Sequence, residues 1–458
     1  MQEATDHLPE AQARGRLLRI LGVGFGLAVI IGNTIGAGIL RTPGEVANHL
    51  SLGWMFIAVW IAGGCYALLG ACSVAELGTM IPRSGGQYVF AREALGDYAG
   101  FIVGWSDWIS TCGTSAAVSV VIGEYLGVLF PALAEHLVAL ALIIVGAFAV
   151  LQWRGIRWGS NIQNVTSLLK ALAFVGLVIA CFALGGNKSA TPQTAEAAPS
   201  AVPSLIGFVL ALQAVIYTYD GWTGVIYFSE EVRNPARDIP RSIFGGVLSI
   251  ITIYLLVNFA LLYVLPISQI AGANLAMGAA AQAIFGQHGD AVIRSLTIVS
   301  MLSAINACQL MATRVLFAMS RDGLVSSRVV RVNKGGTPAI ALFASTVVAV
   351  LFILGGSLET SHKIFDRIIA VLAFFFVVNY AISYTSLFLL RRREPDRPRP
   401  YRAWGYPWTT GIALAGSAGF LVGAVFSDTR NSIYALLVLA ASYPAFRLFR
   451  RATQPKAS

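Results

Sequence analysis

The chain has 458 residues, of which 56% are hydrophobic and only 12% charged, with a formal net charge of +10 and a mean hydropathy of +0.71. Soluble globular proteins carry about 25% charged residues, so this composition excludes that class. Apolar runs of roughly 20 residues, the length that crosses a bilayer, recur along the chain. They are solid runs, unlike the alternating segments of about ten residues in outer-membrane barrels. The sequence therefore predicts an all-α polytopic membrane protein.

Apolar runs and helix breakers predict twelve spans in chain order. They lie at 20–42, 53–78, 95–129, 137–153, 158–184, 203–229, 242–265, 290–320, 338–356, 364–390, 405–427 and 431–449. The predicted organisation is a tail (1–19), a first five-helix unit (20–184), an outward loop (185–202), a second five-helix unit (203–390), a basic loop (391–404), helices 11 and 12 (405–449) and a tail (450–458).

Lysine and arginine are concentrated in the loops and tails on the same side as the N-terminus. By the positive-inside rule, this distribution predicts that both termini are cytoplasmic in a cytoplasmic (inner) membrane. Basic clusters such as 391–393 would then face anionic lipid. The positive net charge is therefore a topology signal, and we expect no binding of nucleic acid.

Glycine and polar residues interrupt two spans at mid-membrane, as GNTIGAGIL (32–40) in span 1 and YTYDGWTG (217–224) in span 6. Unwound backbone inside a membrane is tolerated only where it lines a cavity, so we predict that helices 1 and 6 are discontinuous. The two spans cross in opposite directions, as expected for an inverted repeat of spans 1–5 and 6–10. Half-helix ends that meet at the midplane offer amides to an anion and carbonyls to a cation, which suits a zwitterion. The alternative is that Gly36 and Gly38 only permit close helix packing.

Four segments resemble the amino acid-polyamine-organocation transporters, which have the LeuT-type fold of two inverted five-helix repeats. They are GNTIGAGIL, AELGTMIPRSGGQY (75–88), YDGW followed by SEEVRNPARDIPRSI (229–243), and RVLFAMSRDGL (314–324). The resemblance covers nearly the whole chain. It implies an amino acid permease with two further C-terminal helices.

The resemblance also implies a substrate site at the two breaks. Backbone amides of Ala37 and Gly38 would hold a substrate carboxylate. The substrate ammonium would bind carbonyls of Thr34, Tyr217 and Asp220, while Tyr217 closes over the substrate from outside and Trp222 and Thr223 border its side chain. The family often has a hydroxyl where this chain has Ala37, so one side-chain contact to the carboxylate is missing.

Lys170 lies in the middle of span 5, where a charged group costs roughly 2.5–3.5 kcal/mol on insertion scales. Sodium-coupled proteins of this fold bind a cation between spans 1, 5 and 8, and a lysine here resembles a built-in replacement for it. We expect Lys170 to donate to carbonyls near Gly32 and Asn33. It is also a candidate carrier of a coupled proton. The alternative is a lysine that snorkels to the interface.

Asp220 is a second charged residue at mid-membrane, within the span 6 break. It would either cap loose backbone N–H groups of the break or contact a substrate amine. In span 3, we expect Asp107 to be a structural hydrogen-bond acceptor.

Charges of alternating sign follow span 6 and predict a cytoplasmic gate. Glu230 and Glu231, with Arg83, Arg321 and Asp322 on the same face, would form an ion-pair network that breaks and re-forms during transport. The alternative is a set of solvated loop charges.

These features predict a sodium-independent secondary transporter of amino acids, most simply neutral ones, that works by alternating access with proton coupling or exchange. The alternatives are an antiporter of polyamines or basic amino acids, and a nutrient sensor with a transporter fold. An enzyme is not expected, since the five histidines are scattered over the tail and outward loops. We expect no cofactor and no metal. All five cysteines lie in apolar runs, so a disulfide-linked accessory subunit is not expected either.

Overall fold

The computed structural model describes residues 17–185, 205–273, 275–357 and 363–453, and this part of the chain is helical without a β-strand. The predicted tails (1–19 and 450–458) and outward loop (185–202) therefore lie largely outside the described residues. Ten described helices are long and apolar enough to cross a membrane, or eleven when one bent pair counts as a span. The class of an all-α polytopic membrane protein is confirmed, while the number twelve and the repeat stay predictions.

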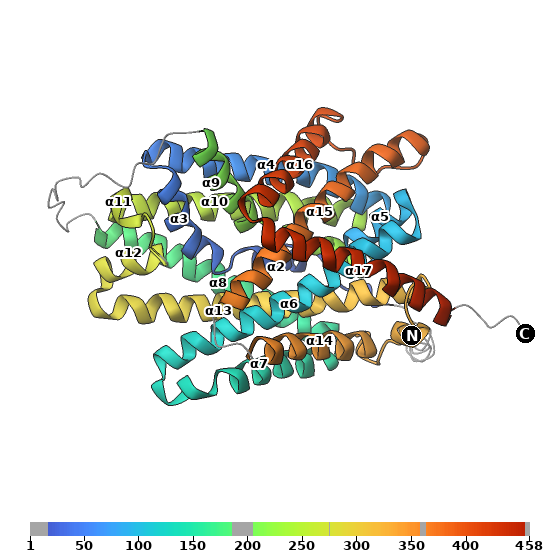
Figure 1. Cartoon of the computed structure of the whole chain (residues 1–458), viewed down its shortest axis with the longest axis horizontal. Coiled ribbons are helices and arrows are strands. Elements are labelled where there is room, and N and C mark those ends of the chain that lie inside the picture. The colour runs from blue at the N-terminus through green and yellow to red at the C-terminus, as the bar shows by residue number, and fades with distance from the viewer. Residues whose placement is uncertain (1–16, 186–204, 274, 358–362, 454–458) are drawn as a thin grey trace, which may run out of the picture.

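The long helices are α4 (Gly53–Met80), α6 (Asp97–Leu129), α7 (Leu137–Trp153), α8 (Ile156–Leu184), α10 (Pro235–Val264), α13 (Gly289–Arg321), α14 (Ala339–Ser357), α15 (Lys363–Arg393), α16 (Trp408–Ser427) and α17 (Thr429–Thr453). The shorter ones are α2 (Val23–Thr34), α3 (Gly38–His49), α5 (Gln87–Leu95), α9 (Leu205–Thr218), α11 (Ile267–Ile270) and α12 (Ala276–Phe285). Four short 3₁₀ helices connect them: η1 (Pro131–His136), η3 (Gly224–Phe228), η4 (Gly286–His288) and η5 (Ser327–Val330). In Figure 1, α5 and the C-terminal part of α17 lie at one end of the molecule, and α11 and α12 lie at the other.

Both predicted helix breaks are present. Helix α2 ends at Thr34 and α3 begins at Gly38, with an angle of 47° between them. Helix α9 ends at Thr218, after which the chain turns and continues as η3. In the described part of the chain, α9 is too short to count as a span. The breaks touch at Gly221, whose φ is +108° and where an added Cβ would lie 2.7 Å from Asn33 Nδ2, so only glycine fits.

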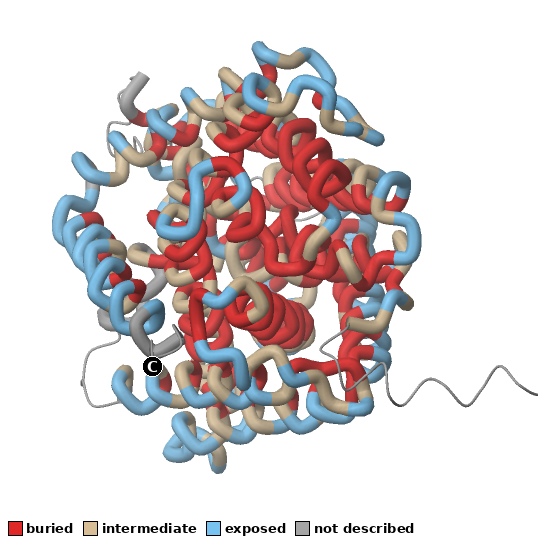
Figure 2. The backbone as a smooth tube through the Cα atoms, turned by 90° about the vertical axis from the view of Figure 1, so that its right-hand side faces the viewer, coloured by how far each residue is buried: buried red, intermediate tan, exposed pale blue. Residues whose placement is uncertain are grey.

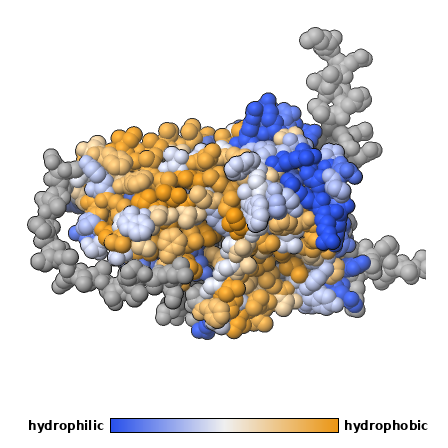
Figure 3. Space-filling view, turned by 90° about the horizontal axis from the view of Figure 1, so that it is seen from above, coloured by the Kyte–Doolittle hydropathy of each residue, from blue (hydrophilic) through white to orange (hydrophobic). Residues whose placement is uncertain are grey.

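Burial follows the arrangement expected for a bundle surrounded by lipid. Figure 2 shows buried residues in the centre and exposed residues around the periphery. Helices α6 and α13 are largely buried, whereas α7 and α17 expose most of their surface. Figure 3 shows an apolar surface along much of the bundle, with hydrophilic residues gathered towards one end. An apolar surface of this extent is typical of a protein that faces hydrocarbon.

Candidate functional site

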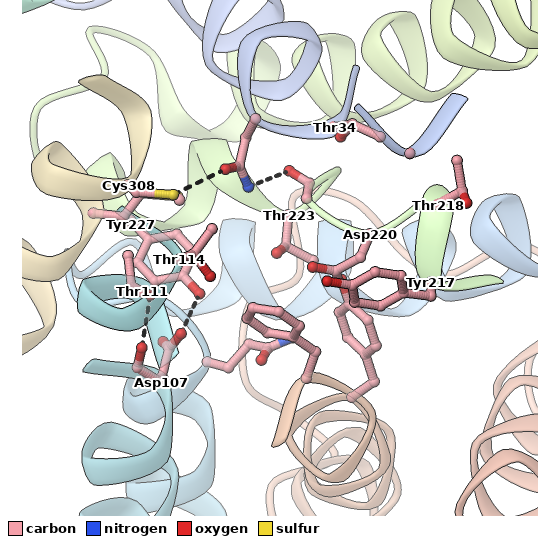
Figure 4. Close-up of a pocket in the computed structure, with 17 residues that line it drawn as sticks. Thr34, Asp107, Thr111, Thr114, Tyr217, Thr218, Asp220, Thr223, Tyr227 and Cys308 are labelled. Carbon is pink, nitrogen blue, oxygen red and sulfur yellow. Dashed lines mark hydrogen bonds between the residues drawn. The ribbon is translucent and has the colours of Figure 1, made fainter. Parts of the chain in front are cut away.

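A cavity of about 150 Å³ lies where the two helix breaks meet. Its walls come from both breaks and from α5, α6, α13 and α15 (Figure 4). The lining residues are Asn33, Thr34, Gly38, Gln87, Asp107, Thr111, Thr114, Tyr217, Thr218, Asp220, Gly221, Thr223, Tyr227, Cys308, Met311, Phe376 and Tyr380. Of the substrate residues implied by the resemblance, five line this cavity: Thr34, Gly38, Tyr217, Asp220 and Thr223. Ala37 and Trp222 do not.

The first break presents a helix N-terminus to the cavity. The first N–H groups of a helix have no partner within it, and they carry the positive end of the helix dipole. Gly38 begins α3 and lines the cavity, while Ala37 directly precedes it as the N-cap residue. A Cβ at Gly38 would lie 3.2 Å from Thr218 Cγ2, so the α3 start is packed closely against the end of α9. This arrangement suits a carboxylate.

Carbonyl groups from both breaks lie beside this N-terminus, although some already accept hydrogen bonds. The Tyr254 hydroxyl on α10 donates to Thr34 O and to Thr218 O, each at 2.9 Å. The Asp220 N–H donates to Tyr217 O at 3.1 Å. A carbonyl oxygen has two lone pairs, so each of these oxygens can accept a second donor such as an ammonium.

Aromatic residues surround the Asp220 side chain. Tyr380 on α15 donates its hydroxyl to Asp220 Oδ1. Trp222, which the resemblance placed at the border of the side-chain pocket, instead stacks against Tyr380 with centroids 5.3 Å apart. The ring lies behind Tyr380 because the turn after α9 directs it towards Gly70, where an added Cβ would be 3.0 Å from the indole. Tyr380 and Phe376 line the cavity, whereas Trp222 does not.

Lys170 lies next to the first break rather than in the cavity. Its side chain is 1% exposed, whereas Leu169 beside it is 51% exposed, so α8 turns the ammonium inward and the leucine outward. Nζ donates to Gly32 O at 2.7 Å and to Ile35 O at 2.5 Å. The expected contact with Gly32 is present, but the second carbonyl is that of Ile35 and not that of Asn33. The chain leaves the helix after Thr34, and Ile35 is extended with ψ 103°, which frees its carbonyl.

Two serines on α13 complete the surroundings of this ammonium. Ser300 donates to Ile35 O at 2.9 Å, and Ser303 donates to Gly32 O at 3.3 Å. The two carbonyls thus accept hydrogen bonds from the ammonium of Lys170 on α8 and from two serine hydroxyls on α13. Such a set of oxygen ligands at a helix break is typical of a small-cation site.

Asp107 on α6 is 1% exposed and forms part of the cavity wall. Its Oδ1 accepts a hydrogen bond of 3.0 Å from the Tyr227 hydroxyl, so it is a structural acceptor as expected. The sequence pattern alone did not place Asp107 at this cavity. Thr111 and Thr114 lie one and two turns further along α6, and these polar residues were the sign in the sequence that this face of α6 lines a cavity. Across the described residues, no group of three or more His, Cys, Asp or Glu side chains is arranged to hold a metal ion.

Ion pairs gather at the end of the bundle that contains α5. Arg83 lies 2.6 Å from Asp322, and Arg92 lies 3.2 Å from the other oxygen of the same carboxylate. The Tyr88 hydroxyl also donates to Asp322, at 3.0 Å. Burial and the neighbouring Asp322 carboxylate raise the pKa of Tyr88.

The two glutamates of the predicted gate have separate partners. Glu230 pairs with Arg321 at 2.5 Å, and both side chains are partly exposed. Glu231 is fully buried and pairs with Arg314, a residue of α13 to which the sequence pattern gave no role. Two hydrogen bonds of 2.9 Å join this pair, and Arg314 lies over the Phe228 ring at 5.2 Å. The predicted gate residues are therefore all ion-paired.

Glu76, a buried carboxylate on α4, holds the basic loop in place. It accepts a hydrogen bond of 2.8 Å from Arg391 and lies 3.2 Å from Arg399. The N–H of Ala403 donates to it at 2.5 Å. This carboxylate connects α4, the end of α15 and the approach to α16.

Comparison with known proteins gives long matches. The sequence model of the amino acid permease family matches residues 26–442. The serine/threonine exchanger SteT of Bacillus subtilis is 28% identical over 439 residues, which cover 94% of this chain and 96% of that protein. The human b(0,+)-type amino acid transporter 1 is 26% identical, with 94% and 88% covered. The human Asc-type amino acid transporter 1 is 27% identical, with 86% and 76% covered.

Proposed function

Because the chain belongs to the amino acid permease family, we propose that it exchanges small neutral amino acids by alternating access, without sodium. The family assignment confirms the resemblance seen in the four motifs, and it makes the protein an amino acid transporter rather than an enzyme. The observation that carries the finer proposal is the cavity at the two helix breaks, which is lined both by Gly38 at the start of α3 and by Thr34, Tyr217 and Asp220 of the breaks.

In the proposed complex, the substrate carboxylate binds the amides of Ala37 and Gly38 at the start of α3. Its ammonium binds carbonyls of Thr34, Tyr217 and Asp220, and the Tyr217 ring closes over it. Anions bind readily at a helix N-terminus because several N–H groups point at one place. The position of Gly38, Thr34, Tyr217 and Asp220 in one cavity wall supports this assignment.

Lys170 would replace a coupling sodium ion. Its ammonium already occupies the carbonyls of Gly32 and Ile35, together with Ser300 and Ser303. A sodium ion at this place would be repelled by the ammonium and would find its oxygen ligands in use. This geometry supports a cycle that is independent of sodium.

The size of the cavity favours a small substrate. An engineered protein cavity of about 150 Å³ holds benzene, which has roughly six non-hydrogen atoms, and the smaller amino acids are of similar size. Exchange is favoured because one relative is named as a serine/threonine exchanger. A basic amino acid or polyamine is the second candidate, because the carboxylates of Asp107 and Asp220 line the cavity while no described lining residue is Lys or Arg.

For the orientation, we propose that the end with α5 and its ion pairs is cytoplasmic in a cytoplasmic membrane, with anionic lipid at the basic loop. Glu230 with Arg321 and Arg83 with Asp322 would then form the inner gate, which opens when these pairs separate. The protein would act without a disulfide-linked subunit, since all five cysteines are free and lie in the helices α4, α6, α8 and α13.

The test is exchange in proteoliposomes that contain the purified protein. We expect uptake of labelled neutral amino acids that requires internal amino acid, is unchanged when sodium is replaced by choline, and does not require a proton gradient. Lys170→Ala is expected to reduce exchange at least tenfold, and the exposed Lys334→Ala serves as its matched control. Strict sodium dependence, a preference for diamines, or no transport of any amino acid would each contradict the proposal.

A further inference from the structure

One oxygen of the Asp107 carboxylate is without a hydrogen-bond partner among the described residues, although it is buried in the cavity wall. Oδ1 accepts from Tyr227, but Oδ2 accepts nothing. Figure 4 shows Asp107 reaching from α6 towards Tyr227 at the edge of the cavity. A buried carboxylate oxygen without a donor is unfavourable, by about 1–3 kcal/mol or more. This oxygen is therefore available to a donor on the substrate.

An unpartnered donor lines the same cavity. Gln87 is 3% exposed and lines the cavity, and within the described part of the chain its Nε2 donates to no acceptor. The residue before it, Gly86, has φ +68° and packs against the Tyr227 ring, so closely that an added Cβ would collide with it. Since the Tyr227 hydroxyl binds Asp107, the Tyr227 side chain places Gln87 and Asp107 in one neighbourhood.

We propose that Asp107 and Gln87 form a specificity subsite for a hydroxyl group on the substrate side chain. A hydroxyl both donates and accepts, so it can donate to Asp107 Oδ2 and accept from Gln87 Nε2. An ammonium has three donors and no acceptor, and would leave Gln87 unpaired. A methyl group would leave both unpaired. This inference rests on the proposed function and narrows its substrate class to short hydroxyl-bearing amino acids.

Tyr227 acts here as a positioning residue. Its hydroxyl fixes one oxygen of the carboxylate, which leaves the other oxygen for the substrate. Thr111 supports the same turn of α6 by donating to the Asp107 carbonyl at 2.6 Å. The subsite is thus held by helix α6 and by the chain around η3, both of which are buried.

The experiment compares hydroxyl substrates with methyl isosteres in the proteoliposome exchange assay. The pairs are serine with 2-aminobutyrate and threonine with valine. A site built to hydrogen-bond a hydroxyl rejects the analogue that lacks it, because its own polar groups are left unpaired. For the wild type we expect each hydroxyl substrate to be preferred by about 10-fold to 100-fold in exchange rate at low concentration.

Two variants test the assignment of that preference, and a third is their control. In Asp107→Asn and in Gln87→Met, the serine to 2-aminobutyrate ratio is expected to fall at least fivefold. The matched control is Asp97→Asn, the same change at a partly exposed position of the same helix, which should keep the ratio. Because each ratio is measured within one variant, differences in the amount of active protein cancel.

The outcomes separate this inference from the proposed function. If the wild type exchanges alanine but does not distinguish serine from 2-aminobutyrate, the subsite is wrong while amino acid exchange stands. A preference for lysine or diamines that disappears in Asp107→Asn would show an amine subsite instead and overturn the hydroxyl assignment. If no amino acid is exchanged, the proposed function itself fails. The wild-type ratios test the preference for a hydroxyl substrate even if a variant does not fold.

Discussion

Removing either partner of the ion pair between Glu231 and Arg314 is expected to destabilise the protein by about 3–5 kcal/mol, because an uncompensated buried charge remains. Both side chains are 0% exposed, and two hydrogen bonds of 2.9 Å join them. The unfolding entropy is about 2.1 cal/mol/K per residue, so it is roughly 1 kcal/mol/K for 458 residues, and the shift in melting temperature is the change in free energy divided by this entropy. The melting temperature should then fall by about 3–5 °C in either single variant.

The assay is thermal unfolding of the detergent-solubilised protein, followed by intrinsic tryptophan fluorescence. The variants are Glu231→Gln, Arg314→Met and the double substitution, which should lose less than the sum of the singles because no lone charge remains. The matched control is Glu230→Gln at the adjacent position, whose ion pair is partly exposed and should contribute less than about 1 kcal/mol. Equal effects of the two glutamine substitutions, or a strictly additive double variant, would refute this reasoning.

Three further predictions concern other parts of the chain. Glu76→Gln should release the basic loop and increase its cleavage by trypsin several-fold; an unchanged cleavage rate would contradict its role. Gly86→Ala should reduce amino acid exchange at least tenfold, because a methyl group would displace Tyr227, whereas Gly96→Ala, also at positive φ but without a close neighbour, should have a much smaller effect. In a variant whose other four cysteines are replaced, Cys308 should react with maleimide at least threefold more slowly when substrate is saturating. An unchanged reaction rate would place Cys308 outside the substrate site.

The two helix breaks could be predicted from the sequence because glycine and polar residues at mid-membrane are unfavourable in a continuous helix that faces lipid. The contact of Lys170 with carbonyl groups of the first break could also be predicted. A buried ammonium must bind oxygen atoms, and the break in helix 1 supplies them. The sequence predicted the region near Gly32 and Asn33, but not that the second carbonyl would be that of Ile35. Which carbonyl turns towards α8 depends on where the helix unwinds, and composition does not determine that residue.

The rest depended on contacts between distant parts of the chain. Arg314 begins one of the four segments that resemble the family, but its partner Glu231 is 83 residues away. Asp107 and Gln87 lie on the consecutive helices α6 and α5, but Tyr227, whose hydroxyl binds Asp107 and whose ring packs against Gly86, is 120 residues further along the chain than Asp107. The direction of the Trp222 ring likewise follows from its contact with Tyr380. Helix phase and long-range packing decide these positions, and neither is encoded in a local pattern.

The tethered ammonium of Lys170 also has a thermodynamic consequence. A sodium ion held by the carbonyls of Gly32 and Ile35 would be released on one side of the membrane and would carry the energy of its gradient into the cycle. A cation that is covalently part of the chain keeps the unwound segment in shape but never leaves it. In the proposed sodium-independent exchange it would therefore add no driving force, and the concentration gradients of the amino acid substrates would alone drive transport.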